Sequence, residues 1–225
     1  MPVTRIDLRG MAALVAMVGL TLAGALFAAD AGARHQNQSA GKSAKPAPPS
    51  GAERVESFKL NLDKKGKKER VFVYSIPENG FPAVYFEVWK RAKGNWRLGQ
   101  VKMVTAVPNT NPEYGLKKAW VSDLNRDHKV EIAVRSAITP SVGESLSIYR
   151  QKSARSLKFR GLQGIGGDQV KVKPKRGKSA AIKVFRLSNH SPDNVEHHEL
   201  WKWSKKADQW RCREDCATGF SASAG

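Results

Sequence analysis

The chain has 225 residues, and its 39 Lys and Arg outnumber its 20 Asp and Glu, which gives a formal net charge of +19. A field of this sign attracts polyanions. The sequence contains no helix-turn-helix, zinc-finger or aromatic-rich RNA-binding signature, and this argues against nucleic acid as the partner. A basic surface that only contacts solvent is the alternative interpretation of the charge.

Residues 1–31 have the layout of a secretory signal peptide. Arg5 and Arg9 form a basic start, residues 11–29 are uncharged and mostly apolar, and small residues with the A-x-A spacing follow. These features predict a secreted or periplasmic protein, for which an anionic envelope polymer or protein is the expected partner. An uncleaved membrane anchor is the alternative, because the apolar run is close to the roughly 17 to 25 residues that span a bilayer.

The rest of the chain divides by composition. Residues 32–52 are mostly Gln, Ser, Ala, Gly, Lys and Pro, with almost nothing apolar to bury, and we expect a disordered linker there. Residues 53–216 are long enough for one domain with a sizeable core, and residues 217–225 are expected to form a flexible tail. Cys212 and Cys216 should form a disulfide in an oxidising compartment, with a redox pair or an intermolecular bond as alternatives.

Short apolar runs between turns rich in Gly, Pro, Asn and Lys predict one strand after another within residues 53–216. The predicted strands are 57–63, 69–74, 84–89 and 95–98, then 118–123, 131–134, 146–149 and 157–159, then 169–172, 181–185, 199–203 and 208–211. They form three units at a spacing of about 50 to 60 residues. We therefore expect an all-β fold of three four-stranded antiparallel blade-like repeats. Typical β-propellers have about four to eight blades, so this one is either partial or completed by a homodimer.

Tryptophans mark two of the predicted hairpins. Trp89 and Trp96 are seven residues apart across one turn, and Trp203 and Trp210 are seven apart across another. Aromatic residues that face each other across a hairpin stabilise it, so we expect both pairs to be cross-strand neighbours in the core, with a ligand-stacking platform as the alternative. The glycine-rich residues 161–167 are expected to form a flexible turn between the second and third units.

Oxygen-bearing side chains recur in the predicted turn after the first strand of the second unit. Asp123, Asn125, Asp127 and Glu131 stand at positions one, three, five and nine of this turn. Alternate residues of a tight loop point inward, so these side chains and the carbonyl of Lys129 can surround one calcium ion. An acidic turn without metal is the alternative. An EF-hand is excluded because its flanks would be helices, whereas these flanks are predicted strands.

The stretch AWVSDLNRDHKVEIAV, within residues 118–135, resembles the FG-GAP or VCBS-type repeat, whose signature loop is D-x-[DN]-x-D-G-x-x-[DE]. The resemblance implies a β-propeller with calcium on its loops, in secreted or surface proteins that mostly bind partners. It implies ligand roles for Asp123, Asn125, Asp127 and Glu131. His128 stands where the signature has Gly, and His is one of the residues that tolerate a positive φ.

The equivalent loops of the first and third units are not expected to bind calcium, because Lys65 and Arg176 stand at ligand positions. No H-E-x-x-H, P-loop, nucleophile-elbow or paired-carboxylate pattern marks a catalytic residue. We therefore expect an exported noncatalytic β-repeat protein for binding or structure, with one calcium-stabilised loop and a basic surface. The alternative function is that of an envelope hydrolase whose active residues are dispersed over the blades.

Overall fold

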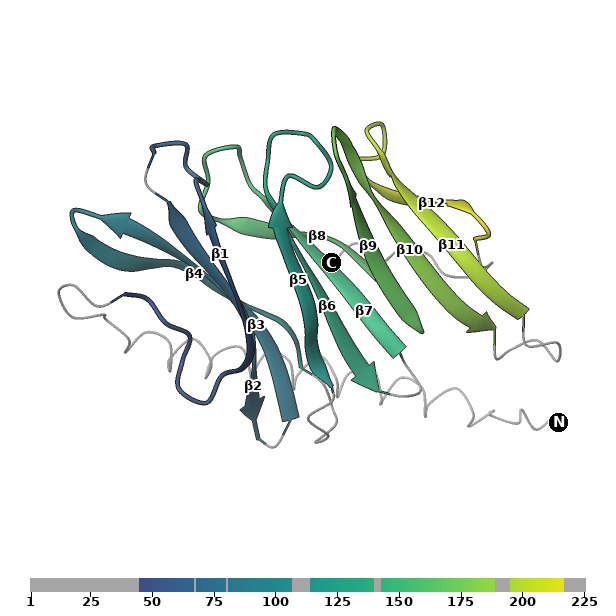
Figure 1. Cartoon of the computed structure of the whole chain (residues 1–225), viewed down its shortest axis with the longest axis horizontal. Helices are drawn as coiled ribbons and strands as arrows, with labels where there is room; N and C mark the ends of the chain where they lie inside the picture. The colour runs from purple at the N-terminus through teal and green to yellow at the C-terminus, as the bar shows by residue number, and fades with distance from the viewer. Residues whose placement is uncertain are drawn as a thin grey trace, which may run out of the picture. The chain divides into compact units, whose positions relative to one another are not determined.

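The computed structural model describes residues 45–66, 68–79, 81–106, 114–139, 143–188 and 195–216, and all regular structure in these ranges is β-strand (Figure 1). Their strands, in chain order, are β1 (Glu53–Leu60), β2 (Glu69–Glu78), β3 (Phe81–Ala92), β4 (Asn95–Ala106), β5 (Gly115–Ser122), β6 (Glu131–Thr139), β7 (Gly143–Gln151), β8 (Phe159–Gly167), β9 (Gln169–Lys175), β10 (Lys178–Ser188), β11 (Val195–Ser204) and β12 (Gln209–Glu214). No helix in this part of the chain has the length and hydropathy needed to cross a bilayer.

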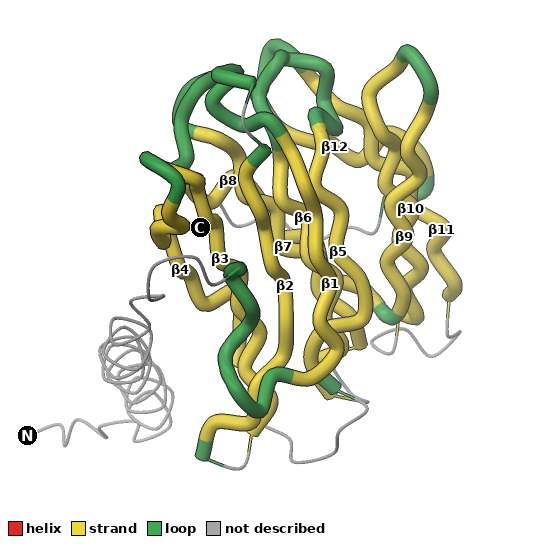
Figure 2. The backbone as a smooth tube through the Cα atoms, turned by 60° about the vertical axis from the view of Figure 1, so that its left-hand side comes forward, coloured by secondary structure: helices red, strands yellow, loops and turns green. Residues whose placement is uncertain are grey.

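The strands form three four-stranded sheets with the orders β1-β2-β3-β4, β5-β6-β7-β8 and β12-β11-β10-β9. All neighbouring strands are antiparallel, and each strand pairs with the one that follows it in its sheet. Figure 2 shows the strands running side by side, with the chain turning back between them. The prediction of an all-β fold with three four-stranded antiparallel repeats is confirmed.

The first and third sheets share a hydrogen-bonded E-x-W motif. The indole Nε1 of Trp89 donates to Glu87 on β3, and that of Trp201 donates to Glu199 on β11, each at 2.7 Å. Both carboxylates are buried, and a buried carboxylate needs such donors. The second sheet has Ser147 and Tyr149 at the corresponding places, so both partners of this bond are replaced there.

Two hydrophobic clusters join the three sheets. The first contains Val73 and Phe86 of the first sheet and Tyr149 of the second, and the Phe86 and Tyr149 rings meet edge-on with centroids 5.0 Å apart. The second cluster contains Ile148 of the second sheet and Trp210 of the third. Because successive side chains point to opposite faces of a strand, the second sheet contributes both of its faces to the core. Each of the other two sheets contributes only one face to these two clusters.

The predicted tryptophan pairing is right in one hairpin and wrong in the other. Trp203 lies opposite Trp210, and their rings meet edge-on with centroids 4.6 Å apart. Trp89 and Trp96 are offset from each other by two positions. The reason is the position of the turn. Lys93 and Gly94 join β3 to β4 and lie one residue past the midpoint between Trp89 and Trp96, whereas residues 205–208 join β11 to β12 and are centred between Trp203 and Trp210. Two residues pair across a hairpin only when they are equally far from its turn.

The prediction of a flexible turn at residues 161–167 is wrong, because these residues belong to β8 and pair with β7. A Cβ atom on Gly167 would lie 2.4 Å from Cγ1 of Val184 and 2.9 Å from the carbonyl oxygen of Phe185. The missing side chain therefore allows β8 to approach β10 of the third sheet. Glycine in this run serves close packing between two sheets, which local sequence does not distinguish from turn formation.

The predicted signal peptide at residues 1–31 and the tail at 217–225 lie outside the described residues and stay predictions. Of the predicted linker, 32–52, the structure describes Lys45–Ala52, where the Ala52 N–H donates to the carbonyl of Pro49 at 3.1 Å. The predicted disulfide between Cys212 and Cys216 is present at the end of β12.

Candidate functional site

The loop between β5 and β6 contains the residues predicted as calcium ligands, and their side chains hydrogen-bond its backbone. The Asp123 carboxylate accepts the N–H groups of Asp127 and His128, at 3.1 and 3.0 Å. Oδ1 of Asn125 accepts the Asp127 N–H at 3.0 Å, and Oδ1 of Asp127 accepts the Lys129 N–H at 2.9 Å. His128 has a φ of 67°, the left-handed conformation expected at this position of the loop. These bonds tie the side-chain oxygens to the backbone N–H groups of the loop.

Glu131 closes the loop from β6 and is fully buried. Its Oε2 accepts the Leu124 N–H at 2.7 Å. Its Oε1 and Nδ2 of Asn125 have no hydrogen-bond partner within the described residues. Burial raises the pKa of Glu131 to about 8, and the nearby carboxylates of Asp127 and Asp123 add to this rise. A cation at the loop would therefore meet a buried oxygen that now has no partner.

Arg150 of β7 supplies a fixed cation beside this loop. Its side chain is 2 % exposed, and its Nη1 lies 3.0 Å from Oδ2 of Asp127 and 2.7 Å from Oδ1 of Asp208. Asp208 belongs to the β11–β12 turn, so the guanidinium links the second sheet to the third. The hydrogen bond to Arg150 lowers the pKa of Asp208. Asp127 thus shares its carboxylate with an arginine that the loop spacing does not predict.

The donor set fits a hard cation only in part. Asp123, Asn125 and Glu131 offer carboxylate or amide oxygens, which calcium prefers, whereas Asp127 already neutralises Arg150. Within the described ranges, no group of three or more His, Cys, Asp or Glu side chains is placed as a ready-made metal site.

The equivalent loop of the first sheet repeats two of these hydrogen bonds with a different set of side chains. Oε2 of buried Glu69 accepts the Leu62 N–H at 2.7 Å, and Oδ1 of Asp63 accepts the Lys65 N–H at 2.9 Å. Burial also raises the pKa of Glu69. The glutamate at the ninth position therefore caps the turn even where a lysine replaces a ligand. In the third sheet only two residues join β9 to β10, so no such loop forms.

The face of the third sheet that lies away from the second sheet forms a separate candidate site. We call it the terminal face, and it consists of Lys171, Lys183, Phe185, His198 and Leu200. The lysines and His198 are exposed, and the two apolar side chains are partly buried. These residues line a hollow of about 430 Å³.

Two lysines of the terminal face lie directly opposite each other, Lys171 on β9 and Lys183 on β10. Like charges at opposed positions destabilise a sheet. No carboxylate in the described part of the chain forms an ion pair with either lysine. Lys173 and Lys175 extend the exposed basic row along β9. Lys171, Lys173 and Lys175 stand at alternate positions of the sequence, whereas Lys183 joins this row only through strand pairing.

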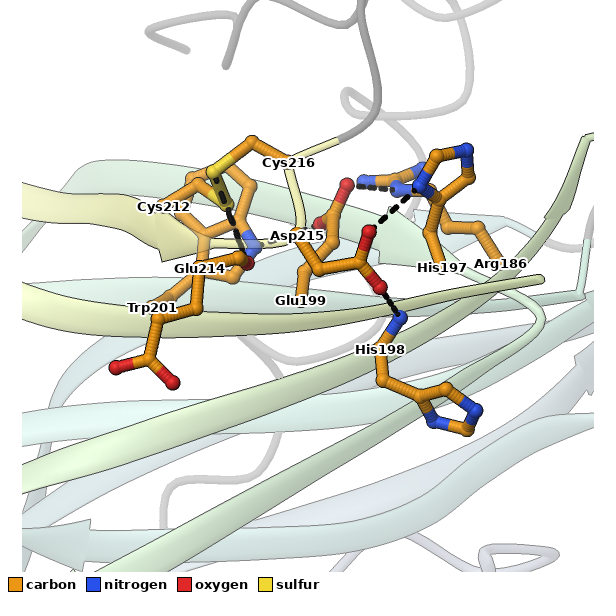
Figure 3. Close-up of a disulfide and its surroundings, with 9 residues drawn as sticks. All are labelled: Arg186, His197, His198, Glu199, Trp201, Cys212, Glu214, Asp215 and Cys216. Carbon is orange, nitrogen blue, oxygen red and sulfur yellow. Dashed lines mark hydrogen bonds and ion pairs between the residues drawn. A yellow bond between two sulfur atoms is a disulfide. The ribbon is translucent and has the colours of Figure 1, made fainter. Parts of the chain in front are cut away.

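The disulfide lies near His198 of the terminal face (Figure 3). It closes a short turn that holds the Asp215 carboxylate on the backbone N–H of His198 and 3.0 Å from Nδ1 of His197. These contacts lower the pKa of Asp215, with the His198 N–H as the main cause and His197 as the next. The two imidazoles point away from each other in Figure 3, and His198 faces the hollow.

Comparison of the chain with protein-family models, with curated protein sequences and with solved structures finds no match.

Proposed function

We propose that this chain is an exported, noncatalytic β-repeat module, secreted or periplasmic, that binds an anionic partner through the terminal face. The observation that carries the proposal is the opposed pair Lys171 and Lys183, which have no ion-pair partner among the described residues. An anionic group between them would remove the repulsion that the sheet otherwise tolerates. The disulfide supports export, because disulfides persist in oxidising compartments.

The carboxylates beside the terminal face favour binding over hydrolysis. Glu199 accepts hydrogen bonds from Trp201 and Arg186, and Glu214 pairs with Lys202 at 2.9 Å. A general acid and base must be able to exchange protons with a substrate, whereas these groups already hold structural partners. An envelope hydrolase with active residues dispersed over the sheets is the alternative proposal.

Substitution of the basic row on β9 tests the proposal. We expect Lys171→Gln, Lys173→Gln and Lys175→Gln together to weaken binding to heparin, a soluble polyanion. Each exposed charge contact contributes on the order of 0.5 kcal/mol, so the triple variant should lose about tenfold in affinity. The measurement is the salt concentration that elutes the protein from a heparin column, together with titration in solution.

The matched control removes the same charge from the first sheet and its loop, through Lys59→Gln, Lys65→Gln and Lys68→Gln, all exposed positions. This variant should stay close to the unsubstituted protein. Equal weakening in both variants would mean that net charge alone governs retention, and the proposal of a specific face would then be wrong.

A second proposal is that the β5–β6 loop binds calcium. The observation that favours it is the buried Oε1 of Glu131, which has no hydrogen-bond partner in the described structure. Asp123, Asn125, Asp127 and the Lys129 carbonyl would supply the other ligands. The role of calcium would be to hold the loop, as in the FG-GAP or VCBS-type repeats that this stretch resembles.

Calcium is expected to raise the melting temperature of the protein, and the increase should be larger at alkaline pH than at acidic pH. Without calcium, the pKa of Glu131 is about 8 in the folded protein and about 4.3 in an unfolded chain. The unfolded chain binds fewer protons between these values, so this group makes stability fall as pH rises through that window. Calcium requires the ionised carboxylate, so its effect should be larger at about pH 8.5 than at about pH 6.

The expected size follows from the affinity of extracellular calcium modules, a Kd of about 10⁻⁴ to 10⁻³ M. Calcium at about 10 mM would then stabilise the fold by roughly 1 to 3 kcal/mol. Glu131→Gln keeps an oxygen for the Leu124 N–H and should abolish the response, and Glu69→Gln is the matched control in the first loop. Differential scanning calorimetry decides, and an unchanged melting temperature at both pH values means that the loop is an acidic turn without metal.

A further inference from the structure

The terminal face occupies the same register positions that join the other sheets to their neighbours. These positions are Phe58, Val71, Val73, Phe86 and Val88 in the first sheet, Trp120, Ala133, Arg135, Leu146 and Ile148 in the second, and Lys171, Lys183, Phe185, His198 and Leu200 in the third. All five residues of the first set belong to the first hydrophobic cluster or pack against it. In the second set, all except Arg135 belong to the second cluster or pack against it. Both sets are therefore docking faces for a following sheet.

The second sheet has a positively charged residue, Arg135, on its docking face. Nη1 of Arg135 donates to the carbonyl oxygen of Val170 on β9, at 3.1 Å, across the contact with the third sheet. Its guanidinium also lies 3.8 Å from Glu144. A positive group on this face is thus compatible with docking when the covering surface supplies oxygen acceptors.

The third sheet keeps two apolar positions of this set, Phe185 and Leu200, and places three basic side chains around them. Phe185 packs against the His198 ring with centroids 5.2 Å apart. Leu187, next on the same face of β10, is 41 % exposed. The surface therefore has an apolar centre and a cationic rim, which is the composition of a protein-binding patch.

A second copy of this chain does not complement the face. The opposite end of the sheet series, which a ring of copies would present to it, consists of the buried residues Phe72, Tyr74, Tyr85, Glu87 and Trp89. Apposition of two terminal faces would bring lysines against lysines in a chain of net charge +19. Burial of unpaired lysines costs more than the apolar contacts would return.

We propose that the terminal face binds an acidic segment of another protein, in which carboxylates alternate with apolar side chains. The carboxylates neutralise Lys171 and Lys183, and the apolar side chains pack on Phe185 and Leu200. The docking reproduces the contact that each earlier sheet makes with the next. This inference rests on the proposed anionic-partner function and narrows it, because a polyanion without apolar groups would leave Phe185, Leu187 and Leu200 unused.

Two labelled peptides of equal length test the inference by fluorescence anisotropy, one of alternating glutamate and leucine and one of glutamate alone. The unsubstituted protein should bind the alternating peptide about tenfold more tightly, because it buries apolar area as well as charge. Phe185→Ser with Leu200→Ser should remove this preference and leave the affinity for polyglutamate unchanged. Lys171→Gln with Lys183→Gln should weaken the binding of both peptides.

The control is Val55→Ser with Phe81→Ser, which removes two exposed apolar side chains of the first sheet, 40 % and 42 % exposed. It should keep the preference, and circular dichroism confirms that each variant is folded. Equal affinity of the unsubstituted protein for both peptides overturns the inference and leaves the proposed function standing. Binding of neither peptide overturns the proposed function as well. A dimer in sedimentation that Phe185→Ser with Leu200→Ser abolishes would assign the face to a second copy and overturn the inference.

Discussion

Replacement of Trp210 by alanine is expected to lower the free energy of unfolding by about 3 to 5 kcal/mol, the range for a large buried aromatic. Trp210 is 1 % exposed and belongs to the cluster between the second and third sheets. Its indole Nε1 donates to the carbonyl of Ala180 at 3.0 Å. Its backbone N–H and carbonyl bond the Gln163 side chain of β8, at 2.9 and 2.8 Å. The substitution would open a cavity and leave the Ala180 carbonyl without this donor.

The matched control is Trp96→Ala in β4. Trp96 is only partly buried and does not face a second tryptophan, so its loss should cost about 1 kcal/mol, as for an ordinary substitution. Urea unfolding followed by tryptophan fluorescence and circular dichroism measures both variants. Equal losses would contradict the register of the two hairpins, because they would make Trp96 and Trp210 equivalent core residues.

The strands were predictable because their signal is local. Alternating apolar residues and turn residues specify where a strand begins and ends, and each predicted segment, such as 84–89, overlaps an observed strand, here β3. Register was less predictable, because it depends on which residues form the turn and on bulges. The register of β3 and β4 shifts between Val88 and Trp89, and nothing in the local pattern marks this irregularity.

In the candidate calcium loop, too, the local residues were predictable from the sequence and the distant contact was not. Asp123, Asn125, Asp127 and Glu131 lie within one loop, so their spacing alone predicts that they converge. Arg150 reaches this loop from β7, and it also bonds a residue 58 positions away in the sequence, Asp208. Sequence periodicity carries no information about such a contact, because it depends on how the second and third sheets pack.

The positive charge of the terminal face was predictable from the sequence, but the presence of uncovered apolar side chains on it was not. The lysines of β9 form an obvious cluster, whereas Phe185 and Leu200 have the alternation of ordinary strand residues. These two side chains are only partly buried because, within the described structure, no further sheet covers this face of β10 and β11. Comparison of the three sheets at equivalent register positions would have been needed to recognise the change from apolar to basic residues.

Replacement of Gly167 by alanine is expected to destabilise the fold by about 3 kcal/mol, the upper part of the range for overpacking. The added Cβ would lie 2.4 Å from Cγ1 of Val184 and 2.9 Å from a backbone oxygen that cannot rotate away. Gly164→Ala in the same strand is the matched control, because nothing lies within 4 Å of its Cβ position. This control should be neutral or slightly stabilising, since alanine reduces the entropy of the unfolded chain. Urea unfolding of the two variants decides between close packing of β8 against β10 and a flexible turn, which would tolerate both substitutions equally.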